Sequence, residues 1–296
     1  MKRFPSLSLL ALVLLCGLTA CSKQEEFEYT DDTVEQDKQV PNVVVTDENG
    51  NTSALPAAST IGVYVIDGDG NVTLQQVEVD ENGHAVLPTS NQNTTMIAYT
   101  PYQEQWGEEA MSEEKEFTVQ DDQSTEAGYW ASDLMIGTMQ TGETTRAAAE
   151  GSMTLNHVMA KVAIHIIDET GRIDLTRIGA TLLNVKGSVM VDLPHQQVNT
   201  MDDSHCDISM RWEMTTDWRI SYYAIVAPQS VAEGTEFFAV TLYGNHENHP
   251  IPEAATLEGG KTYTINMRLT EHGLIYDGWS ITGWEEESER NIDINT

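Results

Sequence analysis

The sequence predicts an all-β chain built from two β-sandwiches in tandem. Runs rich in Val, Ile and Tyr alternate with tight-turn pairs such as Asn49-Gly50, Asp67-Gly68 and Asn82-Gly83, which adopt positive φ angles easily. Apolar residues at helical spacing, sustained over ten or more residues, are missing from almost the whole sequence. The 296 residues, 40% of them hydrophobic, are enough for two modest domains that each bury a core.

Strand-like segments fill both halves of the chain. In the first half they cover residues 43–45, 61–66, 72–79, 85–88, 96–99, 117–119 and 133–136. An acidic segment at 103–116 is expected to contain a short helix. In the second half the strand-like segments cover residues 153–167, 178–193, 218–226, 236–242 and 262–269, with a bulge or break at Gly187. A polar joint at 141–152 separates the two sets, so the predicted sandwiches are residues 41–146 and 147–296.

The first 21 residues have the features of an export signal. Lys2 and Arg3 precede an apolar segment at 9–18, which is shorter than the roughly 18–20 residues that span a bilayer. The segment then ends in Leu-Thr-Ala-Cys at 18–21, which resembles the lipobox of bacterial lipoproteins. That resemblance implies that residues 1–20 are removed as a signal peptide and that Cys21 is acylated, for example with palmitate. A plain secretory signal is the alternative.

Residues 21–40 are expected to form a flexible acidic tether, because they contain too little apolar surface to offset the entropy of ordering. The acidic residues that follow Cys21, at 22–26, resemble the surface-export signal of Bacteroidales lipoproteins. The expected location is therefore the outer face of the outer membrane. The lipid is the only membrane attachment that the sequence predicts.

The charge of the chain excludes one class of partner. Fifteen Lys and Arg face 47 Asp and Glu, and without Lys2 and Arg3 the mature chain carries 13 − 47 = −34. Such a surface repels phosphate backbones and anionic membranes, so nucleic-acid binding is not expected. Cys16 leaves with the signal and Cys21 carries the lipid, so Cys206 has no disulfide partner within the chain.

Two segments resemble metal sites in part. Asp67, Asp69, Asn71 and Glu78 match most of a calcium-loop pattern, but the sixth position is Val72 instead of the glycine that the loop needs. A hairpin turn explains this segment better, and the pattern leaves weak calcium binding open.

The other metal-like segment contains His246 and His249, which lack the His-Glu-x-x-His spacing and a third ligand. Because Pro250 follows, they are expected in a solvated turn. His157 and His165 lie in an apolar run and are expected to be hydrogen-bonded core or edge residues. No metal or cofactor is predicted.

No catalytic motif is present in the sequence. It contains no nucleophile elbow, phosphate-binding glycine loop or dinucleotide fingerprint. Cys206 follows His205 directly, and adjacent side chains of a strand point to opposite faces, so a thiolate–imidazole pair is not expected. Four tryptophans, Trp106, Trp130, Trp212 and Trp218, have either the role of core residues or that of platforms for sugars. The prediction is therefore a non-enzyme.

Four phrases of the chain resemble the fimbrillin-like family. They lie at residues 132–137 (SDLMIG), 153–164 (MTLNHVMAKVAI), 257–266 (LEGGKTYTIN) and 281–284 (ITGW). The resemblance implies two transthyretin-like β-sandwiches exported as a lipoprotein and assembled into type V pili. In shaft subunits of that family a protease removes the lipid and the first strand, and a strand of a neighbouring subunit fills the groove.

The chain departs from the shaft pattern at the expected cleavage site. No arginine lies between Cys21 and Arg146, and cutting at Arg146 would remove a whole domain. Either another protease acts near Lys38, or the subunit keeps its lipid and serves as a base anchor or accessory protein. The tail after Trp284 is either part of a donor strand or a solvated end.

The sequence therefore predicts a structural, accessory or anchor subunit of a cell-surface fimbrium that supports adhesion. The expected partners are neighbouring subunits through strand exchange, the outer membrane through Cys21, and host or bacterial surface ligands. The alternative from the class of binding proteins is a surface glycan-binding lipoprotein of a polysaccharide-uptake system. A surface hydrolase would require converging carboxylates in a cleft.

Overall fold

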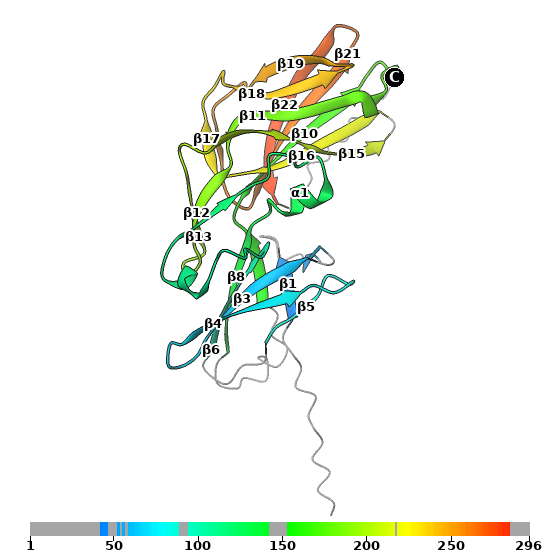
Figure 1. Ribbon diagram of the computed structural model, residues 1–296. Helices are drawn as coiled ribbons and strands as arrows, with labels where there is room; N and C mark the ends of the chain where they lie inside the picture. The colour runs from blue at the N-terminus through cyan, green and yellow to red at the C-terminus, as the bar shows by residue number, and fades with distance from the viewer. Residues whose placement is uncertain are drawn as a thin grey trace, which may run out of the picture. The chain divides into compact units, whose positions relative to one another are not determined.

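The computed structural model describes residues 42–46, 52–53, 55–56, 59–88, 94–141, 153–216 and 218–284, and it is almost entirely β (Figure 1). This confirms the predicted fold class. The described residues belong to one compact unit that spans 39–296. The signal peptide, the tether, Lys38, Arg146, the expected boundary at 146/147 and the tail after Trp284 lie outside the described residues.

An eight-stranded sheet contains most of the first half of the chain. Its order is β2-β1-β9-β8-β6-β3-β4, and β5 also pairs with β1. The strands are β1 (Asn42–Thr46), β2 (Thr52–Ser53), β3 (Thr60–Ile66), β4 (Val72–Glu78), β5 (Ala85–Val86), β6 (Thr94–Thr100), β8 (Met135–Thr141) and β9 (Met153–His157).

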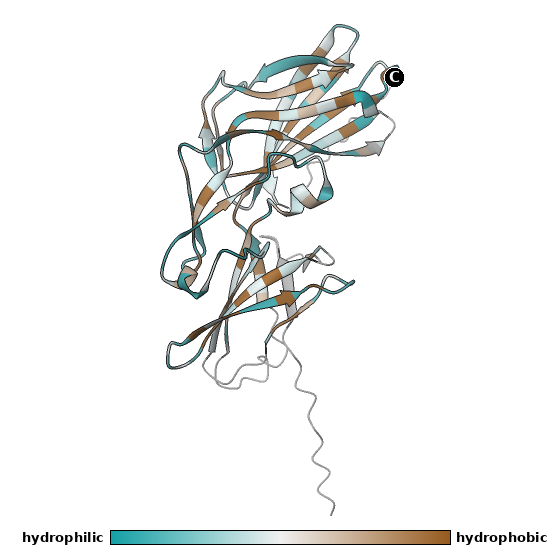
Figure 2. Cartoon of the chain, in the orientation of Figure 1, coloured by the Kyte–Doolittle hydropathy of each residue, from teal (hydrophilic) through white to brown (hydrophobic). Residues whose placement is uncertain are grey.

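The two faces of this sheet are buried against different cores. Alternate residues of β3 and β6, including Ile61, Val63 and Met96, meet Met153 and Leu155 of β9 in a core of their own. The opposite face carries Tyr64, Ile97 and Tyr99, which pack against Trp106 and join the larger core of the chain. Burial on both faces explains why these strands read as continuous apolar runs (Figure 2).

Two sheets form the second sandwich, whose facing residues make up most of the larger core. The five-stranded sheet has the order β15-β16-β10-β21-β22, with β15 (Arg211–Thr216), β16 (Arg219–Val226), β10 (Ala160–Asp168), β21 (Lys261–Thr270) and β22 (Gly273–Gly283). The four-stranded sheet has the order β14-β11-β18-β19, with β14 (His205–Ser209), β11 (Ile178–Lys186), β18 (Glu236–Leu242) and β19 (Asn245–Pro250). In Figure 1, β18, β19 and β11 lie on one side and β10, β16 and β21 behind them.

Smaller elements connect these sheets. The remaining strands are β7 (Lys115–Thr118), β12 (Ser188–Asp192), β13 (Gln197–Thr200), β17 (Gln229–Val231) and β20 (Ala255–Leu257). Among the described residues, the helices are α1 (Glu126–Trp130) and two 3-10 turns, η1 (Glu108–Met111) and η3 (Leu175–Arg177). The 3-10 turn η1 is the short helix expected in the acidic segment. Strand β7, from the first half of the chain, pairs with β12 from the second.

The strand expected at 153–167 is two strands. β9 pairs with β8 of the eight-stranded sheet, whereas β10 pairs with β16 and β21 of the second sandwich. The ladder is interrupted at Val158 and Met159, whose backbone groups bond instead to Leu134 and Gly260. Apolar pattern alone does not reveal this break, because residues on both sides of it are buried. The break expected at Gly187 is confirmed, since β11 ends at Lys186 and β12 begins at Ser188.

The expectation of a solvated turn around His246 and His249 is also wrong. These residues form β19, an edge strand that pairs with β18. Pro250 occupies the last position of the strand, where a missing N–H group is tolerated at a sheet edge. The histidine pair therefore lies on a strand, and its two members sit at an odd spacing that points them to opposite faces.

We expect Gly137→Ala to destabilise the fold. A Cβ at Gly137 would lie 2.1 Å from the carbonyl oxygen of Thr154 in β9, so backbone must move to accept it. Gly179→Ala in β11 is the matched control, because its Cβ would come no closer than 3.7 Å to another atom. Urea unfolding of the full chain should show a loss of roughly 1–3 kcal/mol for Gly137→Ala and a much smaller change for Gly179→Ala. Equal effects would contradict the close approach of β8 and β9.

Candidate functional site

Strand β1 lies between other strands on both sides. Val43, Val44 and Val45 pair in parallel with Met153, Thr154 and Leu155 of β9. On the other side, β1 pairs antiparallel with β5 at Val43↔Ala85 and with β2 at Val45↔Ser53. β1 therefore contributes backbone hydrogen bonds to three neighbours, although it is the first strand after the expected tether.

Residues 153–155 of β9 depend on β1 for their ladder. β9 pairs with β8 only farther along, at Met135↔His157 and Ile136↔Asn156. Met153 and Leu155 are fully buried in the smaller core. Loss of β1 would leave unpaired backbone groups next to buried apolar side chains, which is the arrangement that attracts another strand.

The end of β9 forms a polar contact with the turn before β8. His157 Nδ1 lies 2.8 Å from Asp133 Oδ1, and the Asp133 side chain is only 1% exposed. The expectation that His157 is a hydrogen-bonded strand residue is confirmed. His165 in β10 is likewise buried, with its Nδ1 2.6 Å from Ser221 Oγ.

Trp284, directly after β22, covers this contact. Its ring stacks on His157 with centroids 4.1 Å apart and planes 14° apart. Lys161 Nζ lies 5.0 Å from the centre of the same ring and donates a hydrogen bond to the Trp284 carbonyl oxygen. Thr262 Oγ1 donates to that oxygen as well, at 3.0 Å. The last described turn of the chain is therefore held against β9, β10 and β21.

The glycine turn before β21 packs against the backbone of Val158 and Met159, next to His157. A Cβ at Gly259 would lie 2.4 Å from the Val158 carbonyl oxygen, and Gly260, with φ of +73°, donates its N–H to the Met159 carbonyl oxygen at 2.8 Å. Only residues without side chains allow this approach. The four phrases that carry the family resemblance thus meet around Val158 and Met159, and we call this contact the junction cluster (Asp133, His157, Lys161, Gly259 and Trp284).

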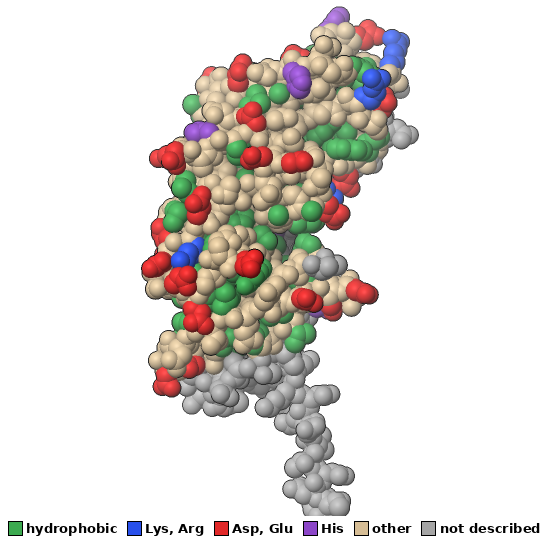
Figure 3. All heavy atoms as spheres, viewed as in Figure 1, with side chains coloured by type: hydrophobic (Ala, Val, Ile, Leu, Met, Phe, Trp, Pro, Cys, Tyr) green, Lys and Arg blue, Asp and Glu red, His purple; other side chains and the backbone are tan. Residues whose placement is uncertain are grey.

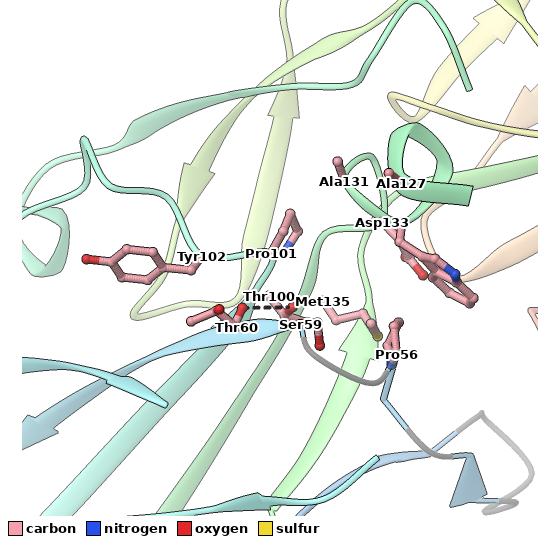
Figure 4. A pocket seen from close by; sticks show the side chains of 11 residues that line it. Pro56, Ser59, Thr60, Thr100, Pro101, Tyr102, Ala127, Ala131, Asp133 and Met135 are labelled. Carbon is pink, nitrogen blue, oxygen red and sulfur yellow. Dashed lines mark hydrogen bonds between the residues drawn. The ribbon is translucent and has the colours of Figure 1, made fainter. Parts of the chain in front are cut away.

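A cavity of about 320 Å³ lies beside the junction cluster (Figure 4). Pro101, Thr60 and Met135 of the eight-stranded sheet and its flanks line one side, and Ala127, Ala131 and Asp133 line the other. Thr100 Oγ1 donates to the Thr60 carbonyl oxygen at 3.4 Å. Asp133 is the one carboxylate among the lining residues, so the cavity does not present the carboxylate pair of a glycosidase.

Comparison with known protein families gives a match over most of the chain. The family model described as fimbrillin-like matches residues 29–284. The chain belongs to the fimbrillin-like family. No curated protein matches it.

Solved structures share the fold of this fimbrillin-like chain. A candidate cell adhesion protein from Bacteroides ovatus is similar at 16% identity and a TM-score of 0.61, over 84% of this chain and 97% of that one. Another from Bacteroides uniformis is similar at 15% identity and a TM-score of 0.58, over 83% and 99%. At these identities the likeness concerns the fold alone.

The calcium-like loop of the fimbrillin-like chain is a hydrogen-bonded turn. Asp67 Oδ1 accepts from the N–H groups of Asp69 and Asn71 at 2.9 and 2.8 Å, and Asp67 Oδ2 accepts from Asn71 Nδ2 at 2.8 Å. The hydrogen bond from the Asn71 side chain, followed by those from the backbone, lowers the pKa of Asp67. No group of three metal-ligating side chains occurs in the described part of the chain.

His246 and His249 are separated on β19. His246 Nδ1 lies 2.8 Å from Thr241 Oγ1, whereas the His249 ring stacks on Phe238. Burial lowers the pKa of His249. The pair therefore does not form a metal site.

Cys206 and His205 point apart, as expected. His205 Nδ1 lies 2.9 Å from the Asn184 carbonyl oxygen, and the Cys206 thiol lies against Gly187. Burial raises the pKa of Cys206 to about 11, so the thiol is protonated and unreactive at neutral pH.

The four tryptophans differ in how far they are buried. Trp106 is buried and donates its indole N–H to the Glu116 carbonyl oxygen at 3.2 Å, so it is a core residue. Trp130 is half-buried and lines the cavity of Figure 4. Trp212 and Trp218 are 48% and 38% exposed. The family resemblance includes Trp284 within residues 281–284, but the sequence does not reveal its contacts with His157 and Lys161, which lie more than 100 positions away.

Acidic side chains outnumber basic ones on the surface that Figure 3 shows. On the face shown in Figure 3, Asp and Glu are spread over the described residues and Lys and Arg are few. Among those residues, no helix is both long and apolar enough to span a bilayer.

We expect Trp284→Ala to lower the free energy of unfolding by about 3–5 kcal/mol, as for other buried aromatic residues. The substitution removes the stacking on His157 and the contact with Lys161. Trp218→Ala removes an exposed tryptophan and should change stability by about 0.5 kcal/mol or less. Guanidinium unfolding monitored by circular dichroism measures both. A small effect at Trp284 would contradict the role of the junction cluster in joining these strands.

Proposed function

We propose that the chain is a structural, accessory or anchor subunit of a cell-surface fimbrium, which associates with neighbouring subunits by β-strand exchange and supports adhesion. Membership of the fimbrillin-like family supports the fimbrial role. The position of β1 supports the strand exchange, because the first described strand of the chain is also the strand on which β9 depends.

Removal of β1 would be unfavourable unless another strand replaces it. The ladder to residues 153–155 would lose its partner, and backbone groups without a partner are costly when buried. Each large apolar side chain that becomes exposed, such as Met153 or Leu155, adds about 1.5–3 kcal/mol. A strand from a second subunit removes both costs, which gives a stable association without a catalytic step.

The anchoring of the subunit rests on Cys21. The lipobox-like sequence at 18–21 supports acylation of this residue and attachment to the outer membrane. Lys38 is the one basic residue in the segment 24–114. A protease that cuts near Lys38 would separate the lipid from the sandwiches while β1 remains in place, so release of β1 requires a second cut between β1 and β3.

The test of strand exchange compares a chain that begins at Ser22 with one that begins after β1, at Asp47. We expect the shorter chain to form polymers that resist dilution, or to bind a synthetic peptide of residues 40–48. The peptide should raise its Tm by several degrees and suppress polymer formation, because it restores the ladder to β9. Size-exclusion chromatography and thermal unfolding measure these effects.

The control is the same peptide with Val43 and Val45 replaced by Asp, which keeps the length but cannot bury an apolar face. The chain that begins at Ser22 should stay monomeric, and neither peptide should change its Tm. If the chain without β1 neither polymerises nor responds to the native peptide, strand exchange at β1 is wrong.

Cys21→Ser should abolish incorporation of an alkyne-labelled palmitate and release the protein from the outer-membrane fraction. Cys16→Ser is the matched control, because that cysteine lies within the signal peptide and should leave labelling unchanged. Labelling in cells followed by membrane fractionation measures both. Equal labelling of the Cys21→Ser and unaltered proteins would contradict acylation at this position.

A further inference from the structure

A groove of about 590 Å³ lies in the second sandwich, apart from the junction cluster and the cavity of Figure 4. It borders the first residues of β11. Strand β14 pairs with β11 only as far as Thr181↔Ser209, after which the chain turns at Met210 into β15 of the other sheet. The Met210 N–H donates to the Ala180 carbonyl oxygen at 3.1 Å, so the turn into β15 lies directly against β11, and the groove borders Ile178 and Gly179 before this bond.

One wall of the groove is aromatic. Trp212 of β15 pairs directly with Tyr222 of β16, so both side chains lie on the same face of the sheet. Trp212 is 48% exposed, although it lies on the face that Tyr222 and Ile164 bury in the core. Tyr222 is only 1% exposed, lines the groove, and its hydroxyl has no hydrogen-bond partner among the described residues.

Carboxylates that accept hydrogen bonds from the fold also line the groove. Asp122 Oδ1 accepts hydrogen bonds from the Ser124 N–H and hydroxyl at 3.0 and 2.5 Å. Asp207 Oδ1 accepts from the Asn184 N–H at 2.8 Å. These hydrogen bonds to one oxygen orient each carboxylate, so the direction of its second oxygen is set as well.

Hydroxyl groups and a glycine complete the groove. Thr181, Ser209 and Thr241 line it together with Gly179. A Cβ at Gly179 would find only the Thr241 Cβ within 4 Å, at 3.7 Å, so the space above this residue is open. The groove thus combines an exposed indole face, oriented acceptors and several hydroxyls within a volume that suits a small ligand.

We propose that this groove is a carbohydrate-binding site, in which the face of Trp212 packs on the C–H face of a sugar ring and Asp122 and Asp207 accept hydrogen bonds from its hydroxyls. Sugar rings have an apolar face and a rim of hydroxyl donors, which match the indole and the carboxylates respectively. The buried Tyr222 hydroxyl supplies a further polar group at the base of the groove.

A sugar fits these groups better than a basic peptide does. A cationic ligand needs negative charge but no particular direction of the acceptors, and acidic residues are spread widely over the face that Figure 3 shows. What distinguishes this groove from the rest of the surface is the exposed indole beside acceptors of fixed direction and hydroxyls. Catalysis is not part of the proposal: hydrogen bonds from Ser124 lower the pKa of Asp122, whereas a glycosidase acid needs a raised pKa.

The test uses affinity electrophoresis of the full chain in gels that contain galactomannan, xyloglucan, dextran or gastric mucin. We expect at least one of these glycans to retard the protein. Trp212→Ala should raise the dissociation constant for the retaining glycan by about tenfold or more, because a stacked aromatic side chain contributes binding free energy on this scale. Asp122→Asn should raise it by a smaller factor, and tryptophan fluorescence titration gives the values.

Trp218→Ala is the matched control, since Trp218 is 38% exposed and does not line the groove. It should bind as the unaltered chain does, and unchanged near-ultraviolet circular dichroism of all variants shows that they fold. The titration is repeated at 0.05 and 0.5 M NaCl, and a separate titration with polylysine tests whether the groove binds a cationic ligand instead of a glycan. Sugar binding should change little with salt.

Three results would overturn the proposal. They are absence of retardation by all four glycans, equal losses for Trp212→Ala and Trp218→Ala, and Trp212-dependent binding of polylysine without any glycan binding. The inference identifies a ligand class for the adhesion in the proposed function, but the assay involves no polymerisation. Loss of glycan binding and loss of strand exchange are therefore distinguishable.

Discussion

The fold depends on a break of two residues, Val158 and Met159, between β9 and β10. The strand before the break belongs to the eight-stranded sheet and the strand after it belongs to the second sandwich. A continuous strand would be the default for so apolar a segment. The hydrogen bonds of Val158 to Leu134 and of Gly260 to Met159 replace the ladder at the break, and the Asp133–His157 contact fixes the strand end that precedes it.

This break explains why distant phrases of the sequence are close in the fold. Each of these segments contacts the chain where it passes from one sheet to the other. Asp133 is hydrogen-bonded to His157, Gly259 leaves room for the Val158 carbonyl group, and the Trp284 ring stacks on His157. A larger residue at Gly259 or a smaller one at Trp284 would disturb the same point. The four separate segments that carry the family resemblance are therefore all needed for the packing around one break in the chain.

Local patterns predicted most strands, since turn pairs and apolar runs act over a few residues. They predicted β3, β4 and β6 well, and also the hairpin turn at Asp67, which its Asp-Gly pair predicts. The hydrogen bonds of the Asp67 carboxylate to its own loop are an addition from the structure. They failed where the deciding contact is distant in sequence. The burial of Trp106 depends on Tyr64, 42 positions earlier, as well as on Tyr99. The edge strand β19 escapes local patterns for a different reason: its partner β18 directly precedes it, but polar residues on both faces leave no alternating apolar pattern. The groove at Trp212 combines residues of five strands with the segment around Asp122 and has no local signature.

The two proposed activities use different strands. Strand exchange concerns β1, β5 and β9 of the eight-stranded sheet, and the groove is lined by residues of β11, β14, β15, β16 and β18 and of the segment around Asp122. No residue that lines the groove pairs with β1. A substitution at Trp212 therefore leaves the ladder of β9 complete, and replacement of β1 by a foreign strand leaves the indole and the two carboxylates in position. A subunit built in this way can keep its ligand site whether it is a monomer or part of a filament.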